Sequence, residues 1–281
     1  MNECLGDWFL QNGEIKKCTE FFTPEKYNIL IYEVIRVING TPVFIENHLE
    51  RLIDSAKLIG FASKINEKQI EAELELLIRT NNMDGNIRLN TYFENLKTTR
   101  LYYFVPHYYP EKVYYQKGVK LLSVKEEREI PNAKILHIEL RKKIEIILLD
   151  KSIYEVALIN TNNCITEGSK SNLFFLKNKE LYTAPDEYVL KGITRKFVLD
   201  IANNLNIPVN YVPINYLILS NFDSAFLTGT SPKVLPVSSI DNFEFKNSNE
   251  LLHLIIFEYN KLIENYISTK KSFYNGPGNC Y

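Results

Sequence analysis

The strongest constraint on the fold is that strand-like and helix-like patterns alternate along the chain. Residues 29–38 are rich in β-branched residues and run into Asn39-Gly40, which predicts a hairpin with residues 42–45 as its second strand. Apolar residues at helical spacing then predict an amphipathic helix over residues 46–59. At a length of 281 residues, this mixture predicts a mixed α/β protein that is too long for one small core.

The same patterns predict the remaining elements. Helices are predicted over residues 67–79, 139–149, 194–205 and 249–267, with a short helical piece near residues 216–220. Strands are predicted over residues 86–93, 100–105, 118–124, 155–160, 164–167, 172–176, 181–183 and 224–227. The character of the chain changes after about residue 112, which predicts a smaller N-terminal α/β domain over residues 1–115 and a larger mixed domain over residues 116–281.

Composition and charge exclude several classes of protein. The formal net charge of -1 lacks the basic excess of a general nucleic-acid-binding protein. No stretch is long and apolar enough to span a membrane, and the first residues lack the pattern of a signal peptide. Cys4, Cys18, Cys164 and Cys280 form no CxxC pair and lie near no histidine cluster. These features predict a cytoplasmic protein with reduced thiols and no metal site.

Two glycine-containing segments are typical of anion-binding loops. Residues 191–195 (KGITR) lead directly into a predicted helix, whose first backbone N–H groups have no internal partner and favour a phosphate. Thr194 can cap this helix, and an ordinary cap after a loop is the alternative. Residues 228–232 (TGTSP) follow a predicted buried strand, and small residues around a glycine let N–H groups approach an anion. A simple turn after the strand is the alternative there.

Two charged residues each have a functional and an ordinary explanation. Arg51 lies opposite the apolar side of its predicted helix, where it can clamp a phosphate or pair with Asp54 at the surface. Glu167 ends a predicted strand and is followed by small polar residues. The alternative for Glu167 is a surface side chain in a polar turn.

Together, five segments resemble the fold-type IV pyridoxal-phosphate enzymes, the class IV aminotransferases, and occur in the order of that family. In chain order they are YEVIRVING, ENHLERLIDSAKLIG, TEGSKSNLF, VLKGITR and LTGTSPKVLPV, from about Tyr32 to about Val237. The group includes branched-chain aminotransferases, D-amino acid aminotransferases and aminodeoxychorismate lyases. The resemblance implies a two-domain α/β fold, pyridoxal 5′-phosphate as cofactor and a homodimer.

The resemblance also implies roles for individual residues. Lys134 corresponds to the Schiff-base lysine, expected on a strand that leads to the next helix. Its alanine and isoleucine neighbours suit an amine that must lose water to act as a nucleophile and proton carrier. Lys142 and Lys143 are competitors, although they lie in a charge-rich helix. Glu167 is expected to face the pyridine nitrogen and keep it protonated.

The other implied contacts fall into three groups. The expected phosphate ligands are Arg51, Gly192, Ile193, Thr194, Gly229 and Thr230. The residues expected to line the ring are Ser171, Asn172 and Leu190, and the expected substrate-binding residues are Tyr32, Arg88 and Ser231. For Arg88, a substrate-carboxylate site and a structural pair with Glu33 or Glu167 both stay open. His137 differs from the asparagine common in two subgroups, so it either contacts the cofactor or packs.

These implications favour an aminotransferase that moves an amino group between an amino acid and a 2-oxo acid. The amino acid is expected to be branched-chain or another small apolar one, of open handedness. A lyase of the aminodeoxychorismate type is the main alternative, and a catalytically silent dimeric scaffold is a third. The presence of Lys134, Glu167 and Arg51 together argues against the scaffold, because a relic has no reason to retain all three.

Overall fold

A computed structural model describes residues 3–62, 65–95, 97–270 and 272–273, and the chain divides into two compact units. Unit 1 comprises Met1–Tyr108, Ala133–Leu136 and Ile263–Tyr281, and unit 2 comprises Tyr109–Asn132 and His137–Leu262. The tetrapeptide that contains Lys134 therefore belongs to unit 1, although the chain on both sides of it belongs to unit 2.

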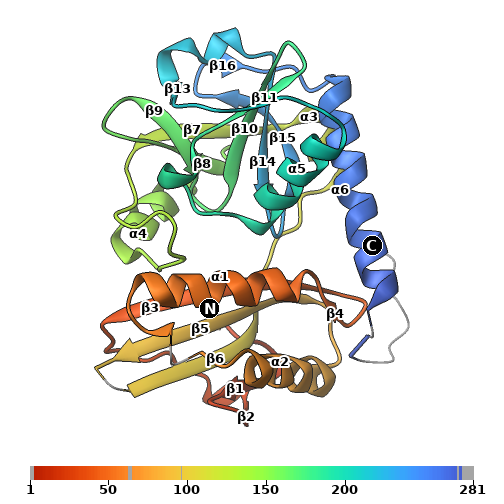
Figure 1. Cartoon of the computed structure of the whole chain (residues 1–281). Helices are drawn as coiled ribbons and strands as arrows, with labels where there is room; N and C mark the ends of the chain where they lie inside the picture. The colour runs from red at the N-terminus through yellow and green to blue at the C-terminus, as the bar shows by residue number, and fades with distance from the viewer. Residues whose placement is uncertain (1–2, 63–64, 96, 271, 274–281) are drawn as a thin grey trace. The chain divides into compact units, whose positions relative to one another are not determined.

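Unit 1 is built on a six-stranded sheet with the strand order β2-β1-β6-β5-β3-β4 (Figure 1). The longest strands are rich in β-branched and aromatic residues, and β5 pairs antiparallel with both β3 and β6. The strands are β1 Leu5–Gln11, β2 Glu14–Lys17, β3 Ile29–Ile38, β4 Thr41–Pro42, β5 Gly85–Glu94 and β6 Lys97–Val105. The predicted hairpin after β3 is confirmed, but its second strand is only the two residues of β4.

The core of unit 1 follows from the two-residue period of β3. Ile31, Ile35 and Val37 point to one face and join a core cluster with apolar residues of helices α1 (Ile45–Leu58) and α2 (Glu67–Asn81). Glu33 has the same phase in the strand and is fully buried. A carboxylate at such a position must find partners, because an unpaired buried charge is strongly unfavourable.

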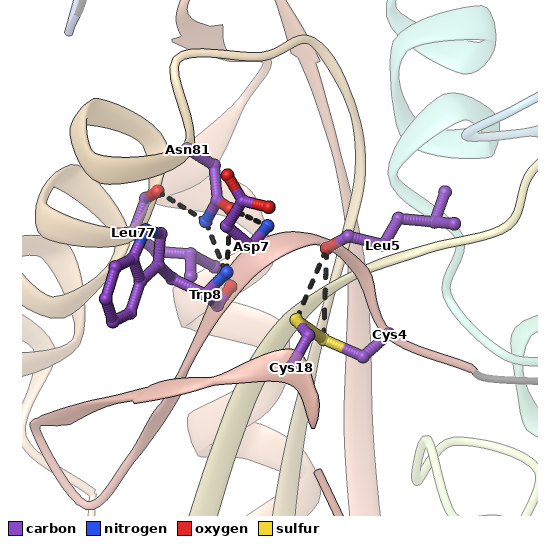
Figure 2. The surroundings of a disulfide bond; sticks show 7 residues. All are labelled: Cys4, Leu5, Asp7, Trp8, Cys18, Leu77 and Asn81. Carbon is purple, nitrogen blue, oxygen red and sulfur yellow. Dashed lines mark hydrogen bonds between the residues drawn. A yellow bond between two sulfur atoms is a disulfide. The ribbon is translucent and has the colours of Figure 1, made fainter. Parts of the chain in front are cut away.

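The N-terminal hairpin of β1 and β2 is held by a disulfide between Cys4 and Cys18 (Figure 2). Both cysteines are buried. The prediction that all the cysteines are reduced thiols is therefore wrong for this pair, because spacing along a chain does not show which residues a hairpin brings together. Cys164 is a free thiol, and Cys280 lies outside the described residues.

The same hairpin is attached to the end of α2 by one amide side chain. Asn81 Oδ1 accepts hydrogen bonds from the backbone N–H groups of Asp7 and Trp8, at 3.0 and 3.1 Å (Figure 2). Its Nδ2 donates to the carbonyls of Trp8 and Leu77, at 3.0 and 3.1 Å. This bridge coincides with an irregularity in β1, where the pairing with β6 shifts between Leu5 and Leu10.

Unit 2 contains a ten-stranded mixed sheet with the order β12-β11-β10-β14-β15-β7-β8-β9-β13, and β16 pairs with β15 (Figure 1). Its strands are β7 Val119–Lys125, β8 Glu155–Ile159, β9 Cys164–Gly168, β10 Asn172–Lys177, β11 Glu180–Thr183, β12 Val209–Tyr211, β13 Ile214–Asn215, β14 Ser224–Gly229, β15 Lys233–Ile240 and β16 Phe243–Glu244. β15 lies inside the sheet but was not predicted, since Pro236 cannot donate to a ladder and argues against a central strand.

The helices of the second half agree with the sequence predictions to within one or two residues. They are α4 Ile138–Ile147, α5 Ile193–Asn204 and α6 Glu250–Thr269, and the short 3-10 helix η4 covers Tyr216–Asn221. The short helix α3 (Lys112–Lys117) and the 3-10 helices η1 (Cys18–Glu20) and η3 (Asp186–Tyr188) were not predicted. Among the described residues, no helix combines the length and apolarity that a membrane span needs.

Candidate active site

Lys134 is fixed to unit 1 through its backbone. Its carbonyl accepts a hydrogen bond from the backbone N–H of Tyr32 at 3.1 Å, and its own N–H donates to Ser55 Oγ on α1 at 3.1 Å. Ile135 forms an isolated bridge with Ile31. The segment therefore lies beside β3 and is not the regular strand that the resemblance implied, because only one residue of it pairs as a bridge.

The Lys134 side chain lies against an aromatic ring. Its Nζ is 5.0 Å from the centroid of the Tyr32 ring, a distance at which an ammonium is attracted by the ring face. The two competing lysines are in different surroundings. Lys142 and Lys143 have side chains that are 64% and 63% exposed and pair with glutamates at the surface. Of the three, Lys134 is partly buried, whereas Lys142 and Lys143 are exposed.

A buried carboxylate on β3 holds Arg51. Glu33 Oε1 accepts from Arg51 Nε at 2.8 Å and Oε2 accepts from Arg51 Nη2 at 2.6 Å, which is a bidentate pair. Oε2 also lies 2.8 Å from His48 Nδ1. Arg51 is thus oriented from β3, and the alternative of a surface pair with Asp54 is wrong, since Asp54 pairs with Lys57.

The charges in this cluster follow from burial and pairing. Burial alone raises the pKa of Glu33, but the Arg51 charge and the hydrogen bonds from Arg51 and His48 outweigh it and hold the pKa at about 2. Burial lowers the pKa of His48, and the Glu33 charge opposes this only in part. His48 is therefore neutral near pH 7, with its Nδ1–H donated to an ionised Glu33.

Arg88 lies on the other face of the same sheet. Its guanidinium carbon is 4.7 Å from the centroid of the Tyr32 ring, so Arg88 and Lys134 both contact that ring. Its Nε donates to Asn90 Oδ1 at 2.8 Å. The alternative of a structural pair with Glu33 or Glu167 is wrong, because those carboxylates bind Arg51 and Arg128.

In unit 2, Glu167 is buried at the end of β9 and has a partner on each side. Its Oε2 accepts from Asn172 Nδ2 at 3.1 Å and from the backbone N–H of Leu190 at 3.0 Å. Its Oε1 lies 2.7 Å from Arg128 Nε. Only 3% of the Glu167 side chain is exposed, so the alternative that Glu167 is a surface residue in a polar turn is wrong. Asn172 and Leu190 were expected to line a ring, and here they orient this carboxylate.

The turn after β9 is organised by a second buried carboxylate. Glu155 Oε1 accepts hydrogen bonds from the backbone N–H of Lys170 at 2.6 Å and from Ser171 Oγ at 3.0 Å. Burial raises the pKa of Glu155, and these hydrogen bonds oppose the rise. The Ser171 hydroxyl is therefore directed at Glu155, which holds the chain between Glu167 and Asn172.

The first turn of α5 has the backbone geometry of an anion site. Gly192 is the N-cap and no side chain caps the helix, so the prediction that Thr194 caps it is wrong. Thr194 is buried in the first turn, with its hydroxyl 3.1 Å from Tyr259 Oη. A Cβ at Gly192 would lie 2.1 Å from Asn172 Oδ1, so only glycine allows this close approach. Uncapped N–H groups at the positive end of a helix favour an anion.

The turn between β14 and β15 contains the other predicted anion-binding residues. Gly229 ends β14 and pairs with Lys233, so Thr230 and Ser231 lie in the connecting turn and are half-buried. Just before them, Thr228 is buried, and its hydroxyl has no hydrogen-bond partner among the described residues. A ligand that forms a hydrogen bond with this buried hydroxyl would explain why the described part of the protein offers it no partner.

Glu33 and Arg128 hold site residues in place, and the sequence did not identify these roles. Glu33 had a usable signal, because it takes an inward position in an alternating strand where apolar residues are expected. Arg128 had no such signal, since it lies in a loop (KEERE) in which every residue is charged. His137 precedes α4, and burial followed by the Arg128 charge lowers its pKa, so it is neutral near pH 7.

Comparison with known proteins adds a family and several relatives. The family model described as amino-transferase class IV matches residues 30–240. The D-alanine aminotransferase of Bacillus licheniformis is 31% identical over 75% of this chain and 78% of its own length. The aminodeoxychorismate lyase of Bacillus subtilis is 24% identical over 87% of this chain and 89% of its own. The structure of Escherichia coli branched-chain amino acid aminotransferase aligns with a TM-score of 0.81 and 21% identity, over 92% of this chain and 95% of that one.

Proposed function

Because the chain belongs to the class IV aminotransferases, we propose that it moves an amino group from a branched-chain or other small apolar amino acid to a 2-oxo acid, with Lys134 as the catalytic residue. The protein is a pyridoxal-phosphate-dependent aminotransferase. The observation that carries the assignment to Lys134 is its setting: a backbone anchored to Tyr32 and Ser55, and an amine against the Tyr32 ring.

The residues present fit this cofactor. The uncapped first turn of α5 offers N–H groups to a phosphate, and Thr228 has a buried hydroxyl without a partner among the described residues. Glu167 is a buried carboxylate held in one orientation, as a protonated ring nitrogen requires. When bound, pyridoxal 5′-phosphate supplies an aldehyde carbon that takes up the amino group and a ring that accepts negative charge from the substrate α-carbon.

Each group then has a defined task. Lys134 would hold the cofactor and would carry the proton at the substrate α-carbon. Glu167, whose Oε1 lies 2.7 Å from Arg128 Nε, would face the ring nitrogen and favour its protonated form.

The remaining roles are assigned as the resemblance to the family implies. Arg51, fixed by Glu33, is assigned to the phosphate, as are Gly192, Ile193 and Thr194 at the start of α5. Gly229 and Thr230 are assigned to the phosphate as well, on the basis of their turn. Arg88 is assigned to a substrate carboxylate, with Tyr32 and Ser231 also contacting substrate. Ser171, Asn172 and Leu190 are assigned to the surroundings of the ring.

Two further properties are proposed, of which the first is implied by the family and the second is expected from the sequence. The chain is proposed to act as a homodimer in the cytoplasm. A sedimentation experiment at micromolar concentration tests the dimer, and a monomer at all concentrations would contradict it.

The assignment of Lys134 is tested on purified protein loaded with pyridoxal 5′-phosphate. Absorbance near the visible edge is expected in the wild type, and borohydride is expected to fix the cofactor to the tryptic peptide that contains Lys134. Lys134→Ala is expected to lose both signals, whereas Lys142→Ala is the matched control and is expected to keep them. A signal that persists in Lys134→Ala would mean that another lysine carries the cofactor.

The substrate is tested with a panel of L- and D-amino donors and 2-oxoglutarate as acceptor. Turnover with branched-chain or small apolar donors is expected, and the panel also determines handedness. Absence of turnover with every donor would refute the aminotransferase assignment for this chain.

A lyase is the second candidate, because the aminodeoxychorismate lyase of Bacillus subtilis matches over 87% of this chain. It predicts that pyruvate is released from aminodeoxychorismate without any 2-oxo acid acceptor. Pyruvate release together with no transamination would favour the lyase over the aminotransferase.

A further inference from the structure

Asn90 connects Arg88 to two tyrosines on the face of the unit 1 sheet opposite the helices. It is 2% exposed, and its amide makes three hydrogen bonds. Its Oδ1 accepts from Arg88 Nε at 2.8 Å, and its Nδ2 donates to Tyr92 Oη at 2.9 Å and to Tyr103 Oη at 3.1 Å. Both tyrosines are buried as well, so the amide is fixed on every side.

The orientation of this amide follows from donor and acceptor chemistry. An arginine Nε–H can only donate, so the amide oxygen of Asn90 must face Arg88 and the NH2 group must face the tyrosines. Burial raises the pKa of Tyr92, so its phenol stays protonated and accepts from the amide. The network therefore has one arrangement, and that arrangement determines where the guanidinium lies.

The contacts of Arg88 leave its terminal nitrogens facing outward from this network. Nε is used by Asn90, and one face of the guanidinium lies on the Tyr32 ring. Within the described part of the chain, no hydrogen bond or ion pair involves the Nη atoms of Arg88. Those two nitrogens form the fork that matches a carboxylate.

We infer that Asn90 is a positioning residue for substrate recognition: it holds the Arg88 guanidinium through Nε so that the Nη fork receives a carboxylate of the amino acid or 2-oxo acid. This inference rests on the proposed function, in which Arg88 binds a substrate carboxylate. Arg88 could lie on β5 without a buried asparagine two residues away, so the presence of Asn90 calls for an explanation. The cost of burying a polar side chain two residues away is offset only if its hydrogen bonds are made.

The test measures carboxylate binding directly, on holoenzyme, by calorimetric titration with glutarate, a dicarboxylate of the same length as 2-oxoglutarate. Asn90→Leu removes both the acceptor and the donor at nearly constant volume, and its affinity is expected to fall on the order of 10- to 100-fold. Asn90→Asp keeps an acceptor for Arg88 Nε, and the tyrosine hydroxyls can turn to donate to it. Its affinity is therefore expected to lie between those of Asn90→Leu and the wild type.

A double-mutant cycle separates positioning from general damage. Asn90→Leu is combined with Arg88→Gln, which removes the guanidinium. If Asn90 acts through Arg88, its substitution is expected to add little in the Arg88→Gln background. Thr91→Val is the matched control, because Thr91 is equally buried, lies on the opposite face of the same strand, and has a hydroxyl without a partner among the described residues. Its affinity is expected to equal that of the wild type.

The steady-state constants give an independent reading of the same role. Asn90→Leu is expected to raise the KM of the substrate whose carboxylate Arg88 holds by a larger factor than it lowers kcat.

The outcomes distinguish this inference from the proposed function. If Arg88→Gln loses glutarate affinity but Asn90→Leu and Asn90→Asp do not, the carboxylate role of Arg88 stands and the positioning role of Asn90 is overturned. Equal losses from Asn90→Leu with and without Arg88 would also overturn it. No binding of glutarate to the wild type would overturn the inference even if the enzyme transaminates.

Discussion

Glu33 allows the sharpest test of how unit 1 holds Arg51. The carboxylate is fully buried and contacts two basic side chains, Arg51 by two hydrogen bonds and His48 by one. Glu33→Ala leaves Arg51, whose side chain is 10% exposed, without its counter-charge. Removing one partner of a buried pair costs about 3–5 kcal/mol of unfolding free energy, because the remaining charge stays buried and unpaired.

The pKa of Glu33 gives a second, independent magnitude. It falls from 4.5 to about 2 on folding, and at 1.36 kcal/mol per unit this corresponds to about 3 kcal/mol. Since the folded pKa is depressed, this stability is present above pH 4.5 and is lost as the pH falls through about 2. His48 acts in the same direction, because its pKa is lowered on folding and the unfolded chain binds its proton first below about 6.5.

The assay is urea unfolding of the wild type, Glu33→Gln and Glu33→Ala at pH 7, 4.5 and 3. Both variants are expected to lose about 3 kcal/mol or more at pH 7, and their stability is expected to depend less on pH below 4.5. Glu94→Gln, an exposed carboxylate at the end of β5, is the control and is expected to change stability by no more than about 0.5 kcal/mol. A loss below about 1 kcal/mol at pH 7 with an unchanged pH dependence would refute the electrostatic argument.

Three further substitutions have definite expected outcomes. Cys18→Ser removes a disulfide between residues separated by 14 positions. In urea unfolding it is expected to lower the free energy of unfolding by about 3 kcal/mol. A reductant is expected to destabilise the wild type but not the variant. Arg128→Gln breaks a buried ion pair with Glu167 and is expected to cost about 3 kcal/mol by the same measurement, a prediction that fails if the loss is below about 1 kcal/mol. Gly192→Ala places a Cβ 2.1 Å from Asn172 Oδ1 and is expected to cost about 1–3 kcal/mol in thermal unfolding and to weaken cofactor retention; equal retention would contradict the glycine argument.

Local patterns predicted most regular elements because each depends on a short stretch of chain. The helices α1, α2, α5 and α6 are amphipathic and strand β3 alternates, so their periods are visible in ten to twenty residues. The failures have equally local causes. Pro236 argues against the strand in which it lies, and Gly6, with a φ of 78°, interrupts the alternation of β1.

The sequence allowed a site residue to be proposed only where it lies in, or between, segments that resemble the family. Arg51 and Glu167 were proposed because they lie in two of the segments that resemble the family, and Lys134 was proposed from its place in the chain between them; the family model covers the same region. The partners of these residues were not predictable. Arg51 was assigned a possible surface pair with Asp54, whereas its partner is on β3.

The sequence by itself determined the class of protein, its cofactor and most of its regular elements, because these depend on patterns and motifs within single segments. Only the tertiary structure decided which charges meet. Glu33 reaches Arg51 across 18 positions, and Asn90 reaches Tyr103 across 13, through the register of neighbouring elements. A shift of register by one residue would turn each side chain to the opposite face, so these pairs exist only once the sheet is assembled.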